Sequence, residues 1–226
     1  MIESLPKIIG ICGLIGAGKD TVASFIQEIF PQYENAFFAD NLKKSICAMY
    51  GWDYNRIKGL TPEDRYWREQ PDEYWSNKLG YDVTPRNVMQ KIGPLMRNNI
   101  NSAFWVYSLE KTMPKFTLLT DVRYAEEIDL VRRYSGIIIE VDRGEKPFWW
   151  SRAIEYNEAK LYNRSLHFDL DLPQRKAYLD NLAHESEYSW AGINKPDYII
   201  NNNSTLNDLK QEVYNLCNKL KEKYCG

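Results

Sequence analysis

A glycine-rich stretch between a short apolar run and an amphipathic segment constrains this chain more than any other feature. Residues 13–21 read G-L-I-G-A-G-K-D-T. The apolar run before them, 8–12, has the length of a buried strand, and apolar side chains recur after them at helical spacing. Gly13, Gly18 and Lys19 fill the frame G-x-x-x-x-G-K, which is typical of a loop that binds nucleotide phosphates. The alternative is a chance glycine-rich turn between a strand and a helix.

Each part of this loop has a chemical reason. A triphosphate needs many hydrogen-bond donors in a small space, so the backbone must curl tightly with side chains out of the way, which glycine permits. The following helix points free N–H groups and its positive dipole end at the phosphates. Lys19 adds a full charge near the β- and γ-phosphates. The predicted phosphate-binding residues are Gly13, Gly16, Ala17, Gly18, Lys19, Asp20 and Thr21.

Two aspartates are the predicted magnesium residues. Asp20 follows Lys19 where Ser or Thr usually offers a hydroxyl to Mg²⁺, and Thr21 comes one residue late. The Asp20 carboxylate either binds Mg²⁺ through a water or caps the helix, and the sequence does not choose between these roles. Asp121 ends the apolar run 116–120, where proteins with such loops place a second magnesium-associated carboxylate.

The composition is that of an ordinary globular protein, because 44% of the 226 residues are hydrophobic and 27% are charged. The formal net charge of −2 argues against a nucleic-acid partner. No apolar run approaches the ~20 residues of a membrane span, and no signal-peptide pattern opens the sequence. Four cysteines without paired spacing indicate a reducing compartment and no structural zinc: Cys12, Cys47, Cys217 and Cys225. We expect a cytoplasmic protein, in the host cytoplasm if the source is viral.

Strands and helices alternate along the chain, which predicts an α/β domain with a parallel sheet. The expected strands are 8–12, 36–39, 116–120, 137–141 and 198–200. Beyond the helix after the loop, the expected helices are 42–49, 85–98, 102–112, 125–134 and 204–224. Thr84 is the expected N-cap of the second of these, with Pro85 in its first turn. The stretch 51–83 is expected to be irregular, and 144–190 is too long for a simple connection.

Several short segments of the chain form an ordered set that extends over nearly its full length. They are residues 13–21, F-A-D-N-L-K at 38–43, M-Q-K-I-G-P-L-M-R at 89–97, F-W-V at 104–106, T-D-V-R-Y at 120–124, H-E-S-E at 184–187 and I-I-N-N-N-S-T-L-N-D-L at 199–209. This set resembles the deoxynucleoside monophosphate kinases of tailed bacteriophages, including those of T-even phages. The G-K-D-T form of the loop is shared with that group. The first segment is specific by itself, and the others count only as an ordered set.

The resemblance implies transfer of the γ-phosphoryl group of ATP to a deoxynucleoside 5′-monophosphate, with Mg²⁺, giving the diphosphate and ADP. It implies a single P-loop kinase domain with a three-layer fold around a five-stranded parallel sheet, a helical monophosphate-binding insertion and a lid. The expected core is 1–50, 114–142 and 191–226, the monophosphate-binding region is 51–113, and the lid is 143–190. The expected partner is a small nucleotide rather than a nucleic acid or a membrane. A homodimer stays open.

Phosphoryl transfer requires positioning and neutralisation of charge, and arginine suits phosphate because it forms paired hydrogen bonds. Lys19, Arg123, Arg143 and Arg152 are therefore the candidate catalytic residues. Arg123 lies near the sheet edge, where it binds a phosphate or forms an ion pair with Glu126 or Glu127. Arg143 and Arg152 begin the lid, where either side chain closes over the phosphates or simply serves solubility.

The candidate substrate residues are Asp40, Lys43, Gln90, Arg97, Arg123 and His184. Asp40 is expected to end the second strand, where it anchors a ribose hydroxyl or caps the next helix. Gln90 and Arg97 share one helical face, for the base and the monophosphate; a turn cap and a charge at the helix end are the alternatives. Lys43 either reaches the acceptor or stays solvated. His184 contacts substrate, orients a loop or is structural, and it lacks a second histidine at metal-ligand spacing.

Three other functions remain open. A small-molecule kinase of the phosphomevalonate or dephospho-coenzyme A type shares most of these features. A nucleotide-binding switch is the second, although no guanine-reading N-K-x-D motif is present. A kinase of polynucleotide ends is the third, and the lack of a basic excess weakens it.

Overall fold

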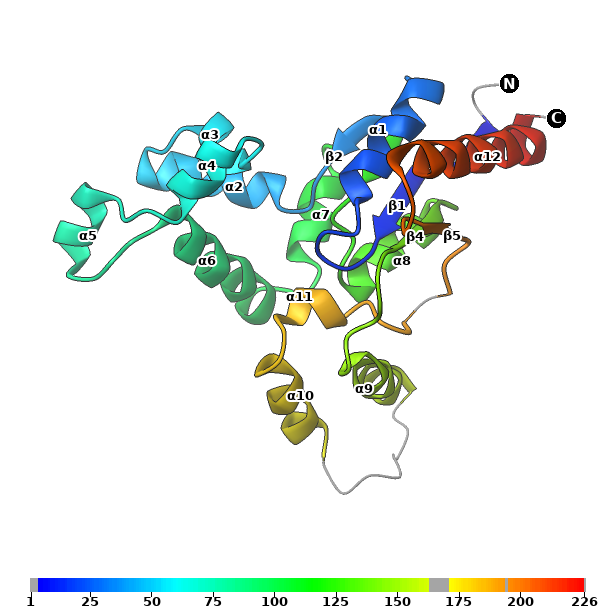
Figure 1. The fold of residues 1–226 in the computed structure, drawn as a ribbon. Coiled ribbons are helices and arrows are strands. Elements are labelled where there is room, and N and C mark those ends of the chain that lie inside the picture. The colour runs from blue at the N-terminus through cyan, green and yellow to red at the C-terminus, as the bar shows by residue number, and fades with distance from the viewer. Residues whose placement is uncertain (1–3, 163–170, 194, 226) are drawn as a thin grey trace. The chain divides into compact units, whose positions relative to one another are not determined.

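The computed structural model describes residues 4–162, 171–193 and 195–225 (Figure 1). The chain divides into two compact units. The first unit comprises Met1–Ala36 and Pro114–Gly226, and the second comprises Phe37–Met113. The second unit thus begins before residue 51, the expected start of the monophosphate-binding region.

The first unit is built on a five-stranded parallel sheet with the strand order β2-β3-β1-β4-β5. Its strands are β1 (Ile8–Cys12), β2 (Glu34–Ala36), β3 (Thr117–Leu119), β4 (Ile137–Asp142) and β5 (Tyr198–Asn201). The predicted α/β P-loop fold is therefore confirmed. β1 lies in the centre between β3 and β4, so the loop that follows it opens at the carboxyl edge where the strand order reverses, the usual ligand-binding place in such sheets.

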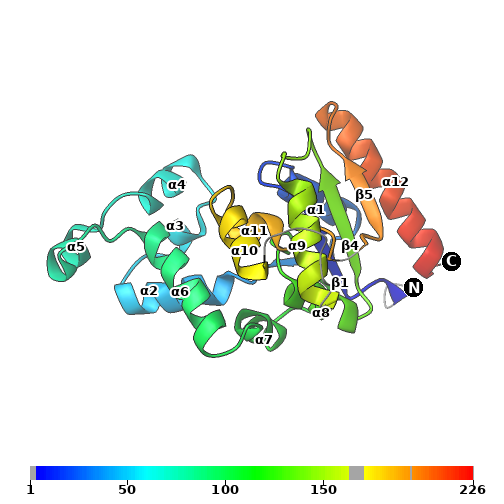
Figure 2. The ribbon, with the colours of Figure 1, turned by 90° about the horizontal axis from the view of Figure 1, so that it is seen from below.

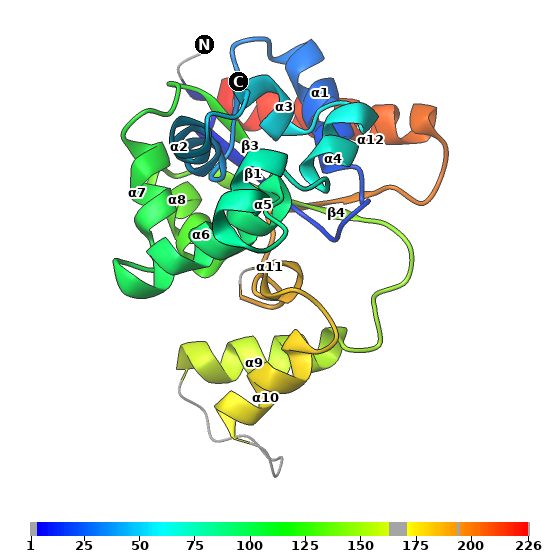
Figure 3. The same ribbon diagram turned by 90° about the vertical axis from the view of Figure 1, so that its left-hand side faces the viewer.

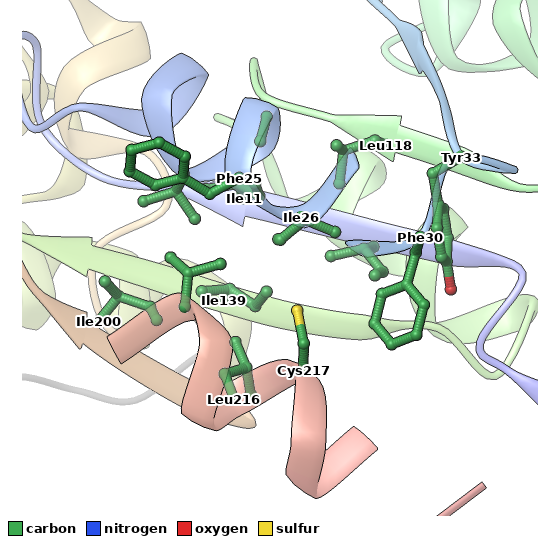
Figure 4. Close-up of a cluster of buried hydrophobic side chains, with 14 of the residues drawn as sticks. Ile11, Phe25, Ile26, Phe30, Tyr33, Leu118, Ile139, Ile200, Leu216 and Cys217 are labelled. Atoms are coloured by element: carbon green, nitrogen blue, oxygen red, sulfur yellow. The ribbon is translucent and has the colours of Figure 1, made fainter. Parts of the chain in front are cut away.

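Alternate residues of β1 pack against different helices because strand side chains alternate between the two faces of a sheet. Ile9 and Ile11 belong to a buried cluster that also contains side chains of α1 (Lys19–Ile29) and α12 (Leu206–Cys225). Figure 4 shows this cluster, and Figure 2 shows α12 alongside β5. On the other face, Gly10 lies below α8 (Ala125–Arg133), where an added Cβ would stand 3.0 Å from Val131. Each large aliphatic side chain buried in this way stabilises the fold by about 1.5–3 kcal/mol.

Three helices occupy the long connection between β4 and β5. They are α9 (Trp150–Tyr162), α10 (Leu172–Asp180) and α11 (Glu185–Tyr188), with α9 and α10 side by side (Figure 3). Asn157 on α9 is buried and donates hydrogen bonds to the Tyr188 and Ala191 carbonyl oxygens, at 2.7 and 2.9 Å. These helices have a small apolar cluster of their own, formed by Trp149, Ala153, Tyr156, Leu179, Tyr188 and Ala191. Residues 163–170 of the expected lid lie outside the described residues.

The second unit is helical in the structure. Its helices are α2 (Asp40–Tyr50), α3 (Tyr54–Lys58), α4 (Pro62–Arg68), α5 (Glu73–Leu79), α6 (Pro85–Asn99) and α7 (Phe104–Glu110). They enclose a cluster of Leu42, Ile46, Trp52, Ile57, Val83 and Val88. Thr84 caps α6 through the Asn87 amide, at 3.1 Å, as its position before Pro85 predicts.

The prediction that residues 51–83 are irregular was wrong. α3, α4 and α5 begin at the caps Asp53, Thr61 and Asp72, whose side chains accept hydrogen bonds from backbone amides. Each helix is only five or seven residues long, and so short a helix shows too little apolar periodicity to be recognised in a sequence.

The second strand was also misplaced. β2 ends at Ala36, and the Asp40 amide donates to the Phe37 carbonyl oxygen at 3.1 Å, which makes 37–40 a turn. Phe38 belongs to this turn rather than to a strand, and its apolar side chain is buried. The remaining predicted helices and strands agree with the structure to within about two residues, within the ordinary uncertainty of such boundaries. Among the described residues, no helix is long and apolar enough to cross a membrane.

Candidate phosphate-binding site

The loop between β1 and α1 has a backbone that its glycines make possible. Gly18 is the N-cap of α1 and has a φ of +95°, and an added Cβ would stand 2.5 Å from the Asn202 side-chain amide. An added Cβ at Gly13 would stand 2.6 Å from the Val141 carbonyl oxygen. The chain therefore curls closely against β4 and the segment after β5, and the free amides of α1 open beyond Gly18.

Lys19 turns back over this loop. Its Nζ atom donates to the carbonyl oxygens of Gly13 and Leu14, at 2.8 and 3.0 Å. Burial lowers the pKa of Lys19, and the nearby positive charge of Arg123 lowers it further. The protonated side chain is thus held at the mouth of the loop at a cost in desolvation, and an anion there would offset that cost.

Arg123 is held at both its backbone and its guanidinium. The Glu127 carboxylate, on a residue only 5% exposed, accepts from the backbone amides of Arg123 and Tyr124, at 2.5 and 3.0 Å. The guanidinium Nη1 donates to Ser186 Oγ at 3.0 Å and to the Glu187 carboxylate. Of the two ion-pair partners that the sequence suggested, Glu127 therefore binds the backbone, and Glu187 forms an ion pair with the side chain.

Glu187 brings α11 to the phosphate-binding loop. Its Oε1 atom pairs with Arg123, and its Oε2 atom accepts a hydrogen bond from the Ile15 amide at 3.0 Å. His184 is the residue of this segment that the sequence predicts for the site, and Glu187 was not predicted. His184 caps α11 through the Ser186 amide, and its Nδ1 atom lies 2.9 Å from Ser186 Oγ. His184 is therefore connected to Arg123 through Ser186.

Two further side chains contact carbonyl groups of the loop. Arg143 Nη1 donates to the Gly16 carbonyl oxygen at 3.1 Å, so the structure brings this predicted residue to the loop. Asn202 Nδ2 donates to the Ala17 carbonyl oxygen at 2.8 Å, and the Asn202 backbone amide donates to the Asp142 carbonyl oxygen at 2.8 Å. Asn202 is not among the site residues predicted from the sequence.

The observed contact of Arg152 is with α10. It lies on α9 with its guanidinium 4.8 Å from the centre of the Tyr178 ring on α10. A cation over an aromatic face is a stabilising packing contact. In this structure, Arg152 joins two helices of the expected lid.

The expected magnesium residues lie at two different elements of the first unit. Asp20 is exposed in the first turn of α1, and Asp121 follows β3 with its Oδ1 atom shielded from solvent. Within the described part of the chain, no cluster of three or more His, Cys, Asp or Glu side chains could hold a metal. One or two carboxylates together with substrate phosphates are the usual ligands of Mg²⁺, so this donor set fits the ion.

The remaining predicted substrate residues lie in the second unit. Asp40 opens α2 instead of ending a strand, with Ala39 at the N-cap, and its carboxylate pairs with Lys44 at 3.4 Å and with the Tyr54 hydroxyl. It therefore neither ends a strand nor occupies the cap position. Lys43 Nζ stands 5.8 Å from the Phe37 ring.

Gln90 and Arg97 are on α6, exposed and half-buried respectively. Pro94 lies between them in the helix and leaves the Gln90 carbonyl without its usual helical donor. A groove of about 470 Å³ in the same unit is lined by Arg56, Pro62, Glu63, Tyr66, Trp67 and Gln70. Neither Gln90 nor Arg97 is among these described lining residues.

Comparisons with known proteins give one relative in sequence. No family model matches the chain. The chain is 28% identical, over 152 residues, to a protein of Acanthamoeba polyphaga mimivirus whose name reads "Putative deoxynucleotide monophosphate kinase". The aligned residues cover 60% of this chain and 74% of the relative.

Solved structures give only weak matches. A gluconokinase from Sinorhizobium meliloti is 13% identical, with 97% of each chain covered and a TM-score of 0.40. An APS kinase from Mycobacterium tuberculosis, in complex with AMPPNP and APS, is 17% identical, with 95% of this chain and 98% of that chain covered and a TM-score of 0.39. Scores at this level support no conclusion, so the fold assignment rests on the strand order and the loop.

Proposed function

We propose that this protein transfers the γ-phosphoryl group of ATP to a deoxynucleoside 5′-monophosphate, giving the diphosphate and ADP. One observation carries the proposal. Three cationic side chains gather at the glycine loop before α1. Lys19 and Arg143 contact carbonyl oxygens of the loop directly, and Arg123 is connected to the loop through Glu187. The ordered motifs and the name of the mimivirus relative support this choice of acceptor.

The donor side uses the loop and α1. The loop amides and the positive end of α1 would bind the phosphates, and Lys19 would exchange its carbonyl contacts for phosphate oxygens. Asp20, Thr21 and Asp121 are the residues that would hold Mg²⁺. The ion, when bound, neutralises charge on the β- and γ-phosphate oxygens.

Arg123 and Arg143 would stabilise the group in transfer. Glu127 fixes the backbone of Arg123, which holds the start of this side chain in place beside the loop. The stretch 143–190 is proposed as the lid, because exclusion of water keeps the phosphoryl group from hydrolysis. Arg152 and His184 would belong to that lid, with Arg152 acting only if it leaves Tyr178.

The acceptor side is proposed for the second unit. Arg97 would bind the monophosphate and Gln90 the base, seven residues apart on one face of α6. Lys43 and Asp40 on α2 would assist with the phosphate and the ribose, because α2 packs on α6. The proposed substrates are small molecules, and the mechanism requires neither a nucleic acid nor a membrane.

The test is an acceptor panel with γ-labelled ATP. Deoxynucleoside and ribonucleoside monophosphates, phosphomevalonate and dephospho-coenzyme A are supplied one at a time, and labelled products are separated. The proposal predicts label on at least one deoxynucleoside monophosphate. Label on another acceptor alone would replace the proposed substrate class, and ATP hydrolysis without any acceptor would favour a nucleotide-binding switch.

A further inference from the structure

Glu187 occupies groups that an anionic ligand of the loop would need. One carboxylate oxygen accepts from the Ile15 amide at 3.0 Å, and the other pairs with Arg123. The Glu187 side chain is only 17% exposed. We propose that Glu187 is a carboxylate latch, which takes the place of a phosphate in the nucleotide-free protein and is displaced when a polyphosphate binds.

Charge explains why the latch is closed without a ligand. The positive charges of Lys19 and Arg123 lie close enough to repel each other, and the negative charge of Glu187 partly offsets this repulsion. A carboxylate bound by a guanidinium and a backbone amide is the arrangement that stabilises phosphate oxygens too. Glu187 thus satisfies groups that would otherwise stand partly desolvated and without an anion.

The same charges explain why the latch must open. A nucleotide triphosphate brings several negative charges to Lys19, Arg123 and the loop amides. A carboxylate left within a few ångströms of those phosphates would repel them and so oppose binding. Binding therefore has to break the contacts of Glu187 before the phosphates take its place, and that cost reduces the observed affinity.

The latch connects the loop to the helices between β4 and β5. Tyr188, the next residue on α11, donates its hydroxyl to Asp180 Oδ1 on α10 at 2.6 Å. Asn157 on α9 donates to the Tyr188 carbonyl oxygen at 2.7 Å. Release of Glu187 would thus remove one of the connections between the loop and α9, α10 and α11, while Leu14 of the loop still packs against their apolar cluster. The inference rests on the proposed function only in requiring that the loop binds polyphosphate.

The test measures binding of AMPPNP and of inorganic tripolyphosphate by calorimetry. The variant is Glu187→Gln, which keeps the shape of the side chain and removes its charge. The matched control is Glu185→Gln on the same short helix, since the Glu185 carboxylate lies 3.8 Å from Lys176 and has no contact with the loop among the described residues. Glu187→Gln is expected to tighten both ligands by about tenfold, the equivalent of one charge-assisted hydrogen bond, and Glu185→Gln by less than about twofold.

The outcomes separate the latch from the proposed function. The latch would be overturned if Glu187→Gln bound the ligands no more tightly than the wild type. The kinase proposal would still stand if the wild type bound them and Lys19→Ala did not. No binding of either ligand by the wild type or by Glu187→Gln would overturn both. If Glu187→Gln does not fold, as judged by circular dichroism, Glu187→Asp replaces it, because the shorter carboxylate cannot span both contacts and is also expected to tighten binding.

Discussion

The Glu187 carboxylate accepts a hydrogen bond from the Ile15 amide, across 172 residues of sequence. The same carboxylate pairs with Arg123. A negative side chain therefore lies where the fold offers a backbone donor and a fixed guanidinium to an anion. This relationship connects the helix α11 to the loop.

Gly18 is expected to tolerate no side chain. Gly18→Ala should lower the free energy of unfolding of the first unit by about 1–3 kcal/mol, because the residue has a positive φ and the new Cβ meets Asn202. It should also weaken nucleotide binding. Thermal unfolding and calorimetry measure both effects.

Gly80→Ala is the matched control for that substitution. Gly80 also has a positive φ, +74°, but nothing lies within 4 Å of an added Cβ. It should show only the backbone strain, about 1 kcal/mol, and leave nucleotide binding unchanged. Equal effects of the two substitutions on nucleotide binding would mean that the close approach of Asn202 does not shape the loop.

Asn202→Ala is expected to loosen the loop without removing a charge. It deletes the hydrogen bond to the Ala17 carbonyl oxygen and should reduce stability by about 0.5–1.5 kcal/mol. Affinity for AMPPNP should fall several-fold. Asn35→Ala, at an exposed position in the middle of β2, serves as the control. Identical AMPPNP affinities for the wild type and Asn202→Ala would show that Asn202 has no part in the loop geometry.

The affinity for ATP is expected to fall as the pH rises into the alkaline range. Burial and Arg123 lower the pKa of Lys19 in the free protein, below its ordinary value of 10.5. Bound phosphates favour the protonated form, so the pKa is higher in the complex, and binding takes up a proton between the two values. Calorimetry in two buffers with different ionisation enthalpies detects this uptake. Lys19→Arg, which keeps its charge throughout, should show no uptake from this site. Equal proton uptake by Lys19→Arg and the wild type would assign it to another group.

Cys12 is expected to be chemically inert. Burial in β1, assisted by the negative charge of Glu140, raises the pKa of its thiol to about 12. At pH 8 the thiolate is therefore scarce, and the native protein should react with iodoacetamide at the half-buried Cys47 and Cys225 well before Cys12. Mass spectrometry of the alkylated peptides measures the order. Labelling of Cys12 first would contradict the burial of β1.

The local part of the site could be predicted from the sequence. A buried strand, a glycine loop and Lys19 at the start of a helix lie within a few residues of one another, so their geometry follows from the motif. Arg143 was also predictable, since it comes directly after β4 at the carboxyl edge of the sheet. The sheet itself follows from the alternation of strands and helices.

The rest of the site depends on contacts that the sequence does not encode locally. Glu187 and Asn202 reach the loop from segments far along the chain, and nothing in H-E-S-E or N-N-N says which residue points there. Asp40 was misread because the three-residue strand β2 ends at Ala36, the first residue of the apolar segment 36–39, rather than at the end of that segment. The apolar character of that segment reflects a buried turn.

Phosphoryl transfer by the Lys19→Ala variant is the most direct test of the central claim. The assay follows γ-labelled ATP and the best deoxynucleoside monophosphate acceptor, with Lys7→Ala as the control, because Lys7 is exposed at the opposite end of β1. Loss of the Lys19 charge removes stabilisation that phosphoryl transfer needs, and we expect turnover to fall by at least about 100-fold. Because burial of the Lys19 charge has a desolvation cost, the thermal midpoint of the Lys19→Ala protein should stay unchanged or rise. Turnover equal to that of the wild type in a folded Lys19→Ala protein would contradict the account.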